Sequence, residues 1–162
     1  VILAIAVVAG LFGSIPDVTT NRTQAGEVAR AIAASGKPGD VVAYCPDQLG
    51  PAVNRLLPPG RYSQTTFPRG TGPVYVNWVD YAAAVRAASP VLFAQHLESM
   101  AAAGHQIYLV WAGGYQSFGL KCEGIVQTLQ EDPHYQGQVL VVGNDNQFYQ
   151  PMWLVRFTPT AP

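Results

Sequence analysis

The sequence has few charged residues and no excess of either sign. Only 12% of its 162 residues are charged, and the formal net charge is -1 at neutral pH. Proteins that bind nucleic acid through its phosphates need a concentrated basic face. The composition therefore argues against nucleic acid as a partner.

Cysteine is also scarce, and the usual patterns of metal and nucleotide sites are missing. Two cysteines form no CxxC pair and the three histidines are scattered along the chain, so the sequence predicts no metal site. The glycine-rich stretch "WAGGYQSFG" lacks both the P-loop ending and the spacing of a dinucleotide site. We therefore expect no cofactor.

The apolar run at the N-terminus, "VILAIAVVAGLFG", is shorter than the about 20 residues that span a bilayer. It also lacks the positive leader and the small-residue cleavage pattern of a signal peptide. We interpret residues 1–15 as the outer end of a truncated transmembrane helix, with a core element of a soluble domain as the alternative. Residues 16–162 are predicted to form one extracytoplasmic domain, a usual size for a single core.

The rest of the chain alternates between helical and strand patterns. Periodic apolar residues predict helices at 20–35, 48–57, 81–88, 91–104 and 118–130, and β-branched or aromatic runs predict strands at 40–45, 62–67, 74–79, 106–114, 138–145 and 152–159. This alternation predicts an α/β three-layer sandwich with a mainly parallel, Rossmann-like sheet. The last strand is expected to form an antiparallel C-terminal edge.

In parallel α/β sheets, ligands bind beyond the carboxyl ends of the strands. The segments predicted to lie there are "CPDQ", "WVDY", "WAGGYQSFG" and "GNDNQ". Their carboxylates, amides and aromatic rings suit sugar hydroxyls and sugar ring faces. The candidate ligand-binding residues are Asp47, Gln48, Trp78, Asp80, Trp111, Gly113, Gly114, Tyr115 and Ser117.

Several of these residues also have plainer interpretations. Asp47 and Asp80 each precede a helical segment, where a carboxylate caps backbone N–H groups; the alternative is a carboxylate pair that binds sugar hydroxyls or acts as acid and base. Ser117 is one residue out of register for a hydrolase nucleophile elbow. Core packing is the alternative role for the aromatic residues. No residue is assigned as catalytic.

Cys45 and Cys122 are predicted to lie at the same end of the sheet. They could form a disulfide worth about 4 kcal/mol in the chain-entropy model, remain buried thiols, or serve in catalysis or metal binding. A disulfide would indicate a domain outside the cytosol.

Four stretches together resemble a known family: "TNRTQAGEVARAIA", "PGDVVAYCPDQLGPAVNRLLP", "VNWVDYA" and "YLVWAGGYQSFGLKCEG". They resemble the C-terminal extracytoplasmic domain of actinobacterial multi-spanning membrane glycosyltransferases of the GT-C class. These are mannosyltransferase-like enzymes that use polyprenyl-phosphate sugars. The resemblance covers most of the chain, and "YCPDQLGP" and "VWAGGY" carry most of it.

The resemblance implies an accessory role in the cell envelope. The catalytic carboxylate of such enzymes lies on an early loop between membrane helices, outside this sequence. The resemblance further implies a disulfide between Cys45 and Cys122, and a domain on the extracytoplasmic side of the cell membrane. Its partners would be its own membrane domain upstream of Val1 and a glycan acceptor or polyprenyl-phosphate sugar. The alternative is a free-standing extracytoplasmic module that binds a glycan or small ligand.

Overall fold

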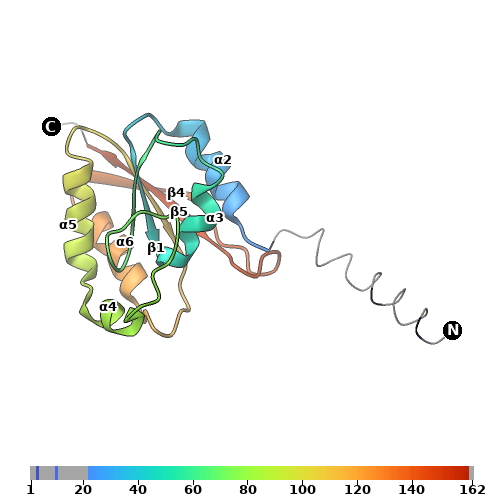
Figure 1. Cartoon of the computed structure of the whole chain (residues 1–162). Coiled ribbons are helices and arrows are strands. Elements are labelled where there is room, and N and C mark those ends of the chain that lie inside the picture. Colours follow the sequence, from blue (N-terminus) through green and yellow to red (C-terminus); the bar gives the residue numbers. More distant parts are fainter. Residues whose placement is uncertain (1–2, 4–9, 11–21, 161–162) are drawn as a thin grey trace.

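The computed structural model describes residues 22–160, together with Leu3 and Gly10. A five-stranded mixed sheet with the order β2-β1-β3-β5-β4 forms its centre, and helices cover both faces (Figure 1). The elements are α2 (Ala25–Ser35), β1 (Val41–Cys45), η1 (Asp47–Leu49), α3 (Gly50–Asn54), β2 (Ser63–Thr66), α4 (Tyr81–Ala87), α5 (Pro90–Met100), β3 (Ile107–Trp111), α6 (Lys121–Glu131), β4 (Tyr135–Val141) and β5 (Trp153–Pro159). The predicted α/β class is confirmed.

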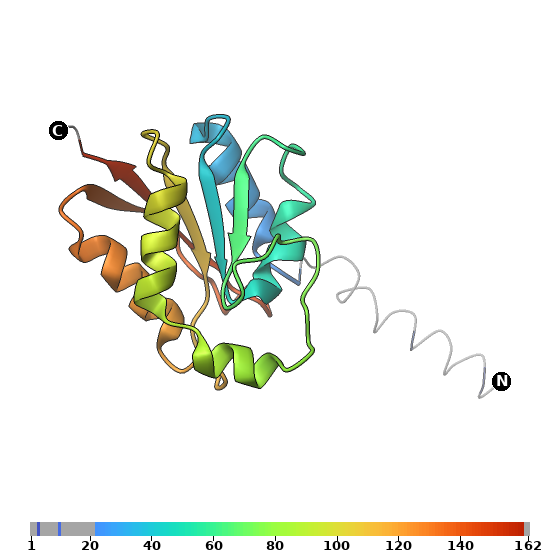
Figure 2. The same ribbon diagram turned by 60° about the vertical axis from the view of Figure 1, so that its left-hand side comes forward.

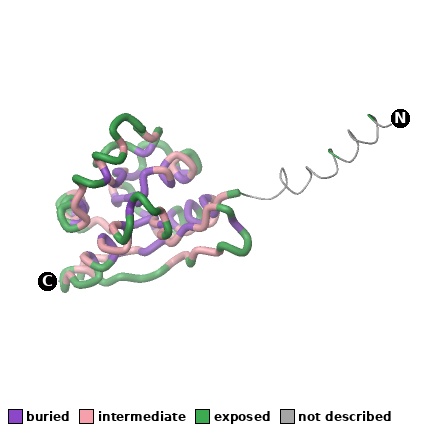
Figure 3. Tube along the Cα trace, turned by 90° about the horizontal axis from the view of Figure 1, so that it is seen from below, coloured by how far each residue is buried: buried purple, intermediate pink, exposed green. Residues whose placement is uncertain are grey.

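Strand β1 lies inside the parallel half of the sheet, paired with β2 on one side and β3 on the other. All five of its residues are buried. Val41, Ala43 and Cys45 pack on the face covered by α4, α5 and α6, and Val42 and Tyr44 pack on the face covered by α2 and α3. A continuous apolar run is what a strand covered on both faces requires. Buried positions accordingly concentrate in the interior of the domain (Figure 3).

The C-terminal strand does not form the edge of the sheet, contrary to the sequence-based prediction. β5 lies between β3 and β4 and is antiparallel to both, so the sheet has two parallel and two antiparallel pairings. The apolar character of the two strands explains their order. β5 buries Leu154, Val155 and Phe157, whereas β4 exposes Gln136 and Gln138. The more apolar strand takes the inner position.

A second difference concerns residues 74–79, which were predicted to form a strand. This segment belongs to the connection between β2 and α4 and is not part of the sheet. A strand needs a ladder partner and a pleated surface that is at least half buried. Here Val74, Tyr75, Trp78 and Val79 are all exposed.

The described chain enters the domain along the β4–β5 connection. Thr23 forms a parallel bridge with Gln150. The side chain of Gln24 is buried and donates to the carbonyl of Val142, while its Oε1 accepts from the N–H groups of Asn144 and Met152. The entry point is therefore firmly attached to the sheet.

The predicted membrane segment at residues 1–15 lies outside the described residues, apart from Leu3 and Gly10. The division of the chain at that point stays a prediction. Among the described residues, no helix combines the length and the apolar character that crossing a bilayer demands.

Candidate functional site

The chain leaves the neighbouring parallel strands β1 and β3 on opposite faces of the sheet. After β1 it runs through η1 and α3 on one face, and after β3 it runs through α6 on the other. Ligand crevices of open α/β sheets form where connections diverge in this way. We call this end of the sheet the carboxyl rim, comprising residues 46–48, 67–81, 112–120 and 142–152 (Figure 2).

Asp47 is the buried acid of the carboxyl rim, with only 4% of its surface exposed. Its N–H donates to the carbonyl of Phe67 at 2.9 Å, which joins the loops after β1 and β2. Its Oδ1 accepts a hydrogen bond from the hydroxyl of Tyr81, the first residue of α4. The carboxylate is thus held by a tyrosine from a distant segment of the chain.

Burial raises the pKa of the Asp47 carboxyl above its ordinary value. The hydrogen bond from Tyr81, nearby backbone N–H groups and the positive charge of Arg69 act in the opposite direction. Burial and the neighbouring Asp47 raise the pKa of the Tyr81 hydroxyl as well. Tyr81 therefore remains a proton donor at neutral pH.

Arg69 places a cation beside this pair. Its Nη2 donates to the carbonyl of Val79, and its Nε is buried without a hydrogen-bond partner. A buried polar atom without a partner is unfavourable until one arrives. The guanidinium therefore retains hydrogen-bonding capacity next to Asp47.

Aromatic rings line the carboxyl rim in a continuous row. The ring of Trp78 lies 4.9 Å from that of Tyr81, Tyr81 lies 6.1 Å from Phe118, and Phe118 lies 6.3 Å from Tyr115. We call these four residues the aromatic row. Its outer end, Trp78, is 62% exposed, so one indole ring is available to a ligand.

The glycine-rich turn after β3 packs against helix α6. A Cβ atom on Gly113 would lie 2.6 Å from Oε1 of Glu123, so this position has room only for glycine unless Glu123 moves. Gly114 has a positive φ of +81°, a conformation that glycine adopts without strain. The Oε2 of Glu123 and the Nε1 of Trp111 are both buried without partners.

A cavity of about 170 Å³ opens between this turn and the chain before β5. Ala112, Gly113, Gly114, Tyr115, Tyr149, Gln150 and Pro151 line it. Nε2 of Gln150 donates to the hydroxyl of Tyr115 at 3.3 Å. This bond joins the glycine-rich turn to Gln150, which forms the bridge with Thr23 where the described chain enters the domain.

The predicted disulfide between Cys45 and Cys122 is present. It joins the carboxyl end of β1 to the first turn of α6 and closes a loop with a sequence separation of 77. No other cysteine is found in the sequence. The bond excludes the alternative of a cysteine nucleophile or metal ligand.

The structure brings only part of the predicted site together. Asp47, Trp78 and Tyr115 are connected through Tyr81 and the aromatic row. Asp80 occupies the N-cap position of α4 but makes no side-chain cap bond, and it is exposed. Ser117 is exposed too.

Trp111 lies apart from the aromatic row. It stacks on Trp153 of β5, its cross-strand neighbour, with ring centroids 5.2 Å apart. Trp111 therefore has the alternative role given for the aromatic residues in the sequence analysis, which is packing and not sugar stacking.

The sequence-based prediction missed Arg69, Gln150 and Glu123 as site residues. Tyr81 stood in the selected segment "WVDY" as an aromatic ring that could stack on a sugar, but its hydrogen bond to Asp47 was not foreseen. Arg69 lies in a loop rich in proline and glycine that offered no periodic signal. Gln150 and Glu123 come from segments whose position depends on the strand order, which the pattern does not determine.

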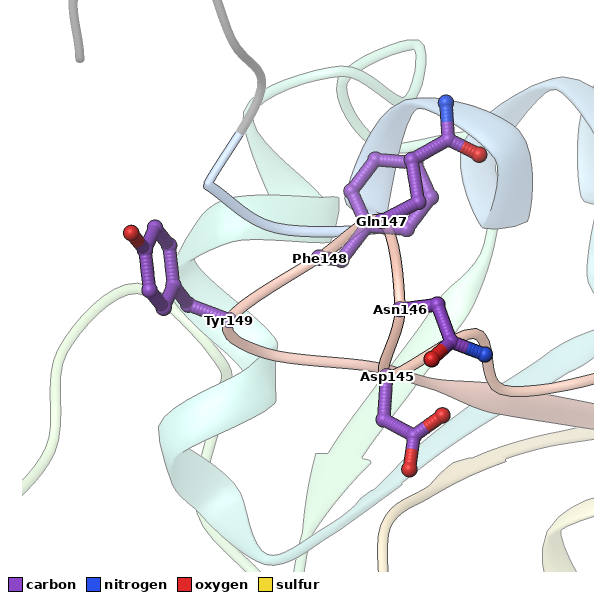
Figure 4. A pocket seen from close by; sticks show the side chains of 5 residues that line it. All are labelled: Asp145, Asn146, Gln147, Phe148 and Tyr149. Atoms are coloured by element: carbon purple, nitrogen blue, oxygen red, sulfur yellow. The ribbon is translucent and has the colours of Figure 1, made fainter. Parts of the chain in front are cut away.

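The segment "GNDNQ" forms a separate hollow. Asp145, Asn146, Gln147, Phe148 and Tyr149 line it, and their side chains fan out in different directions rather than converge (Figure 4). Phe148 is buried, whereas Tyr149 is 83% exposed. This hollow lacks the convergent polar groups of a binding site.

Two histidines lie at the other end of the sheet. Nδ1 of His105 is 3.5 Å from Oδ1 of Asp40 just before β3, and Nδ1 of His134 is 2.8 Å from Oδ1 of Asp132 just before β4. Within the described part of the chain, His, Cys, Asp and Glu side chains form no group of three or more suited to a metal ion.

Comparison with protein-family models, with curated proteins and with solved structures finds no match to this chain.

Proposed function

We propose that this chain is an accessory, extracytoplasmic domain of a membrane glycosyltransferase, and that its carboxyl rim binds a sugar-containing ligand. The enzyme would transfer a mannose-like sugar from a polyprenyl-phosphate donor to a glycan, lipid or protein of the cell envelope. The sequence resemblance suggests this class. The observation that carries the binding role is the Asp47–Tyr81–Arg69 cluster beside an exposed indole ring.

The chemistry of the cluster suits a hydroxyl-rich ligand. The Asp47 carboxylate accepts hydrogen bonds, Arg69 donates them, and the Tyr81 hydroxyl does both. The exposed face of Trp78 adds an apolar surface for a pyranose ring, 4.9 Å from Tyr81. A few placed polar groups beside aromatic rings are the usual composition of a small-molecule site.

The disulfide supports an extracytoplasmic location, because disulfides persist in oxidising compartments and are rare in the cytosol. The apolar run at residues 1–13 of the sequence supports attachment to the cell membrane. The membrane domain upstream of Val1 would then be the natural partner.

The carboxyl rim is better suited to binding than to catalysis. Cys45 is held in a disulfide, and His105 and His134 pair with aspartates at the opposite end of the sheet. His96 is exposed along α5. Ser117 therefore lacks the oriented base that a hydrolase nucleophile requires, which favours the accessory role.

We also infer a Rossmann-like relationship for the parallel half of the domain. The order β2-β1-β3, with connections on opposite faces of the sheet, supports it. In doubly wound folds that begin with this order, the ligand lies between β1 and β3.

The proposal is tested by measuring binding of mannose-containing oligosaccharides and of a polyprenyl-phosphate mannose analogue to the 162-residue chain by calorimetry. We expect Asp47→Asn and Trp78→Ala each to weaken binding at least tenfold, whereas Glu131→Gln, an exposed acid at the far end of α6, leaves it unchanged.

Two results would decide against parts of the proposal. Transfer of mannose from the lipid-linked donor by this chain alone would contradict the accessory role. A full-length gene without further hydrophobic spans upstream of Val1 would favour the alternative, a free-standing glycan or small-ligand binding module.

A further inference from the structure

We propose that residues 74–79 insert into the interfacial layer of a lipid bilayer, so that the carboxyl rim lies against the membrane surface. The inference rests on the membrane attachment in the proposed function and adds the face by which the domain meets the lipid.

The loop exposes an unusual concentration of large apolar side chains. Val74, Tyr75, Trp78 and Val79 are 71%, 74%, 62% and 70% exposed. Contiguous exposed apolar side chains mark interaction sites in soluble domains. Tryptophan and tyrosine in particular have an apolar body with a polar tip and gather at the membrane–water interface.

The loop is anchored rather than loose at both of its ends. Pro73 packs against Gly50, where a Cβ atom would lie 2.9 Å from the Cβ of Pro73. The carbonyl of Val79 accepts from Arg69, and the ring of Trp78 rests on Tyr81. Both ends of the loop are therefore packed against the domain, and the exposed side chains project from this fixed base.

The chain enters the domain on the same rim. Thr23 bridges Gln150, Gln150 donates to Tyr115, and the aromatic row continues from Tyr115 to Trp78. The loop before α4 and the beginning of the described chain both lie toward the arrowhead ends of β1 and β2 (Figure 2). The entry point and the apolar loop thus share one end of the sheet.

Chain length limits how far this rim can be from the apolar N-terminal run. Residues 14–21 separate the run "VILAIAVVAGLFG" from Arg22. At the maximum extension of the backbone they span about 30 Å. An apolar run held in the bilayer therefore keeps the rim that carries residues 74–79 close to the lipid surface.

The size of the loop favours lipid over a protein partner. A stable protein–protein interface buries about 1,200–2,000 Å² with complementary shapes, and four projecting side chains on one short loop supply only a small part of that. Insertion into the interfacial layer needs depth and apolar or aromatic character, but no complementary surface.

Fluorescence quenching tests the proposal on the 162-residue chain reconstituted into vesicles of phosphatidylethanolamine and phosphatidylglycerol. The probe is the same lipid mixture with acyl chains brominated near the headgroup. Trp78 is the exposed member of the three tryptophans, so we expect quenching in the wild type and loss of most of it in Trp78→Phe.

Val74→Ser combined with Val79→Ser should reduce the quenching of Trp78. Val139→Ser, an exposed valine on β4, is the matched control and should leave it unchanged.

The other outcomes separate the failure of the lipid contact from the failure of the proposed function. If Trp78 is quenched by aqueous acrylamide and not by brominated lipid, the loop faces water. If it is shielded from both, protein covers it, namely a second copy of the chain. A chain that does not remain with the vesicles contradicts the membrane attachment itself. If calorimetry finds no sugar binding to the chain while brominated lipid still quenches Trp78, the proposed ligand is refuted and the lipid contact is supported.

Discussion

The two ends of the sheet each contain one buried aspartate, and the two are held in different ways. At the amino end, Asp40 is 1% exposed and accepts from the backbone N–H groups of Lys37 at 2.7 Å and Gln106 at 3.0 Å. At the carboxyl rim, Asp47 is 4% exposed and accepts from the side-chain hydroxyl of Tyr81. Asp40 joins two turns through backbone N–H groups, whereas Asp47 accepts from a side chain of α4.

On the proposed function, this difference separates a structural aspartate, Asp40, from a ligand-binding one, Asp47. The buried Asp40 carboxylate provides an acceptor for the backbone N–H groups of two turns, which stabilises the fold. At Asp47 the donor is a side chain on the short helix α4, and Arg69 lies beside it with an unused buried N–H. On the proposed function, a ligand hydroxyl would take the place of this side-chain donor.

The largest effect is expected from removing the covalent brace of the carboxyl rim. Replacing Cys45 and Cys122 together by alanine should lower the free energy of unfolding by about 3–4 kcal/mol, because the bond closes a long loop. Urea denaturation measures the loss. An unfolding midpoint equal to that of the wild type would show that the rim needs no covalent support.

The second effect tests the architectural aspartate. Asp40→Ala leaves the N–H groups of Lys37 and Gln106 without their acceptor, which should cost about 2–4 kcal/mol of stability. Sugar binding at the carboxyl rim, measured by calorimetry on the folded fraction, should stay unchanged. Weaker sugar binding with stability intact would reverse the roles that we assign to the two aspartates.

A smaller effect is expected at the glycine-rich turn. Gly113→Ala places a methyl group 2.6 Å from Oε1 of Glu123 and should cost about 1 kcal/mol, as mild overpacking does. Adding Glu123→Ala should remove most of this cost in a double-mutant cycle. Gly124→Ala within α6 is the control, because its new Cβ would have ordinary contacts with Pro90. Equal losses with and without Glu123 would contradict the predicted clash.

The smallest effect concerns pH. Because the pKa of Asp47 is raised above its ordinary value of 3.8, the folded state favours the protonated carboxyl. That contribution to stability is complete below the ordinary pKa and is lost as the pH rises through the raised one. The stability of the wild type relative to Asp47→Asn should therefore fall between acidic and neutral pH. Denaturation curves of the two proteins across this pH range measure the difference, and a constant difference would contradict the raised pKa.

The central strands and most helices could be predicted because their apolar residues recur in patterns that indicate buried strands and helices. β1 and β3 are continuous apolar runs, and both are buried almost entirely. The pattern does not determine neighbours, so the insertion of β5 between β3 and β4 was not foreseen. Residues 74–79 have the β-branched and aromatic composition of a strand. Only the three-dimensional arrangement shows that no ladder is available to them.

The candidate site was predicted at the level of segments and not of contacts. Asp47 was singled out because it follows a buried strand. Its partner Tyr81 lies 34 residues further along the chain, and Arg69 lies between them in an irregular loop. The placement of Cys45 and Cys122 at one end of the sheet left a disulfide as one of three alternatives, and the family resemblance implied the pairing. Contacts among irregular loops depend on their full path, which local periodicity does not encode.

The β4 edge of the sheet has a consequence for the protein at high concentration. β4 presents a seven-residue edge whose register shifts between Val139 and Val141. Irregularities of this kind twist an edge strand and interrupt the row of free backbone groups that another chain would copy. The irregular β4 edge thereby disfavours strand pairing between neighbouring molecules, so the carboxyl rim of each molecule stays accessible.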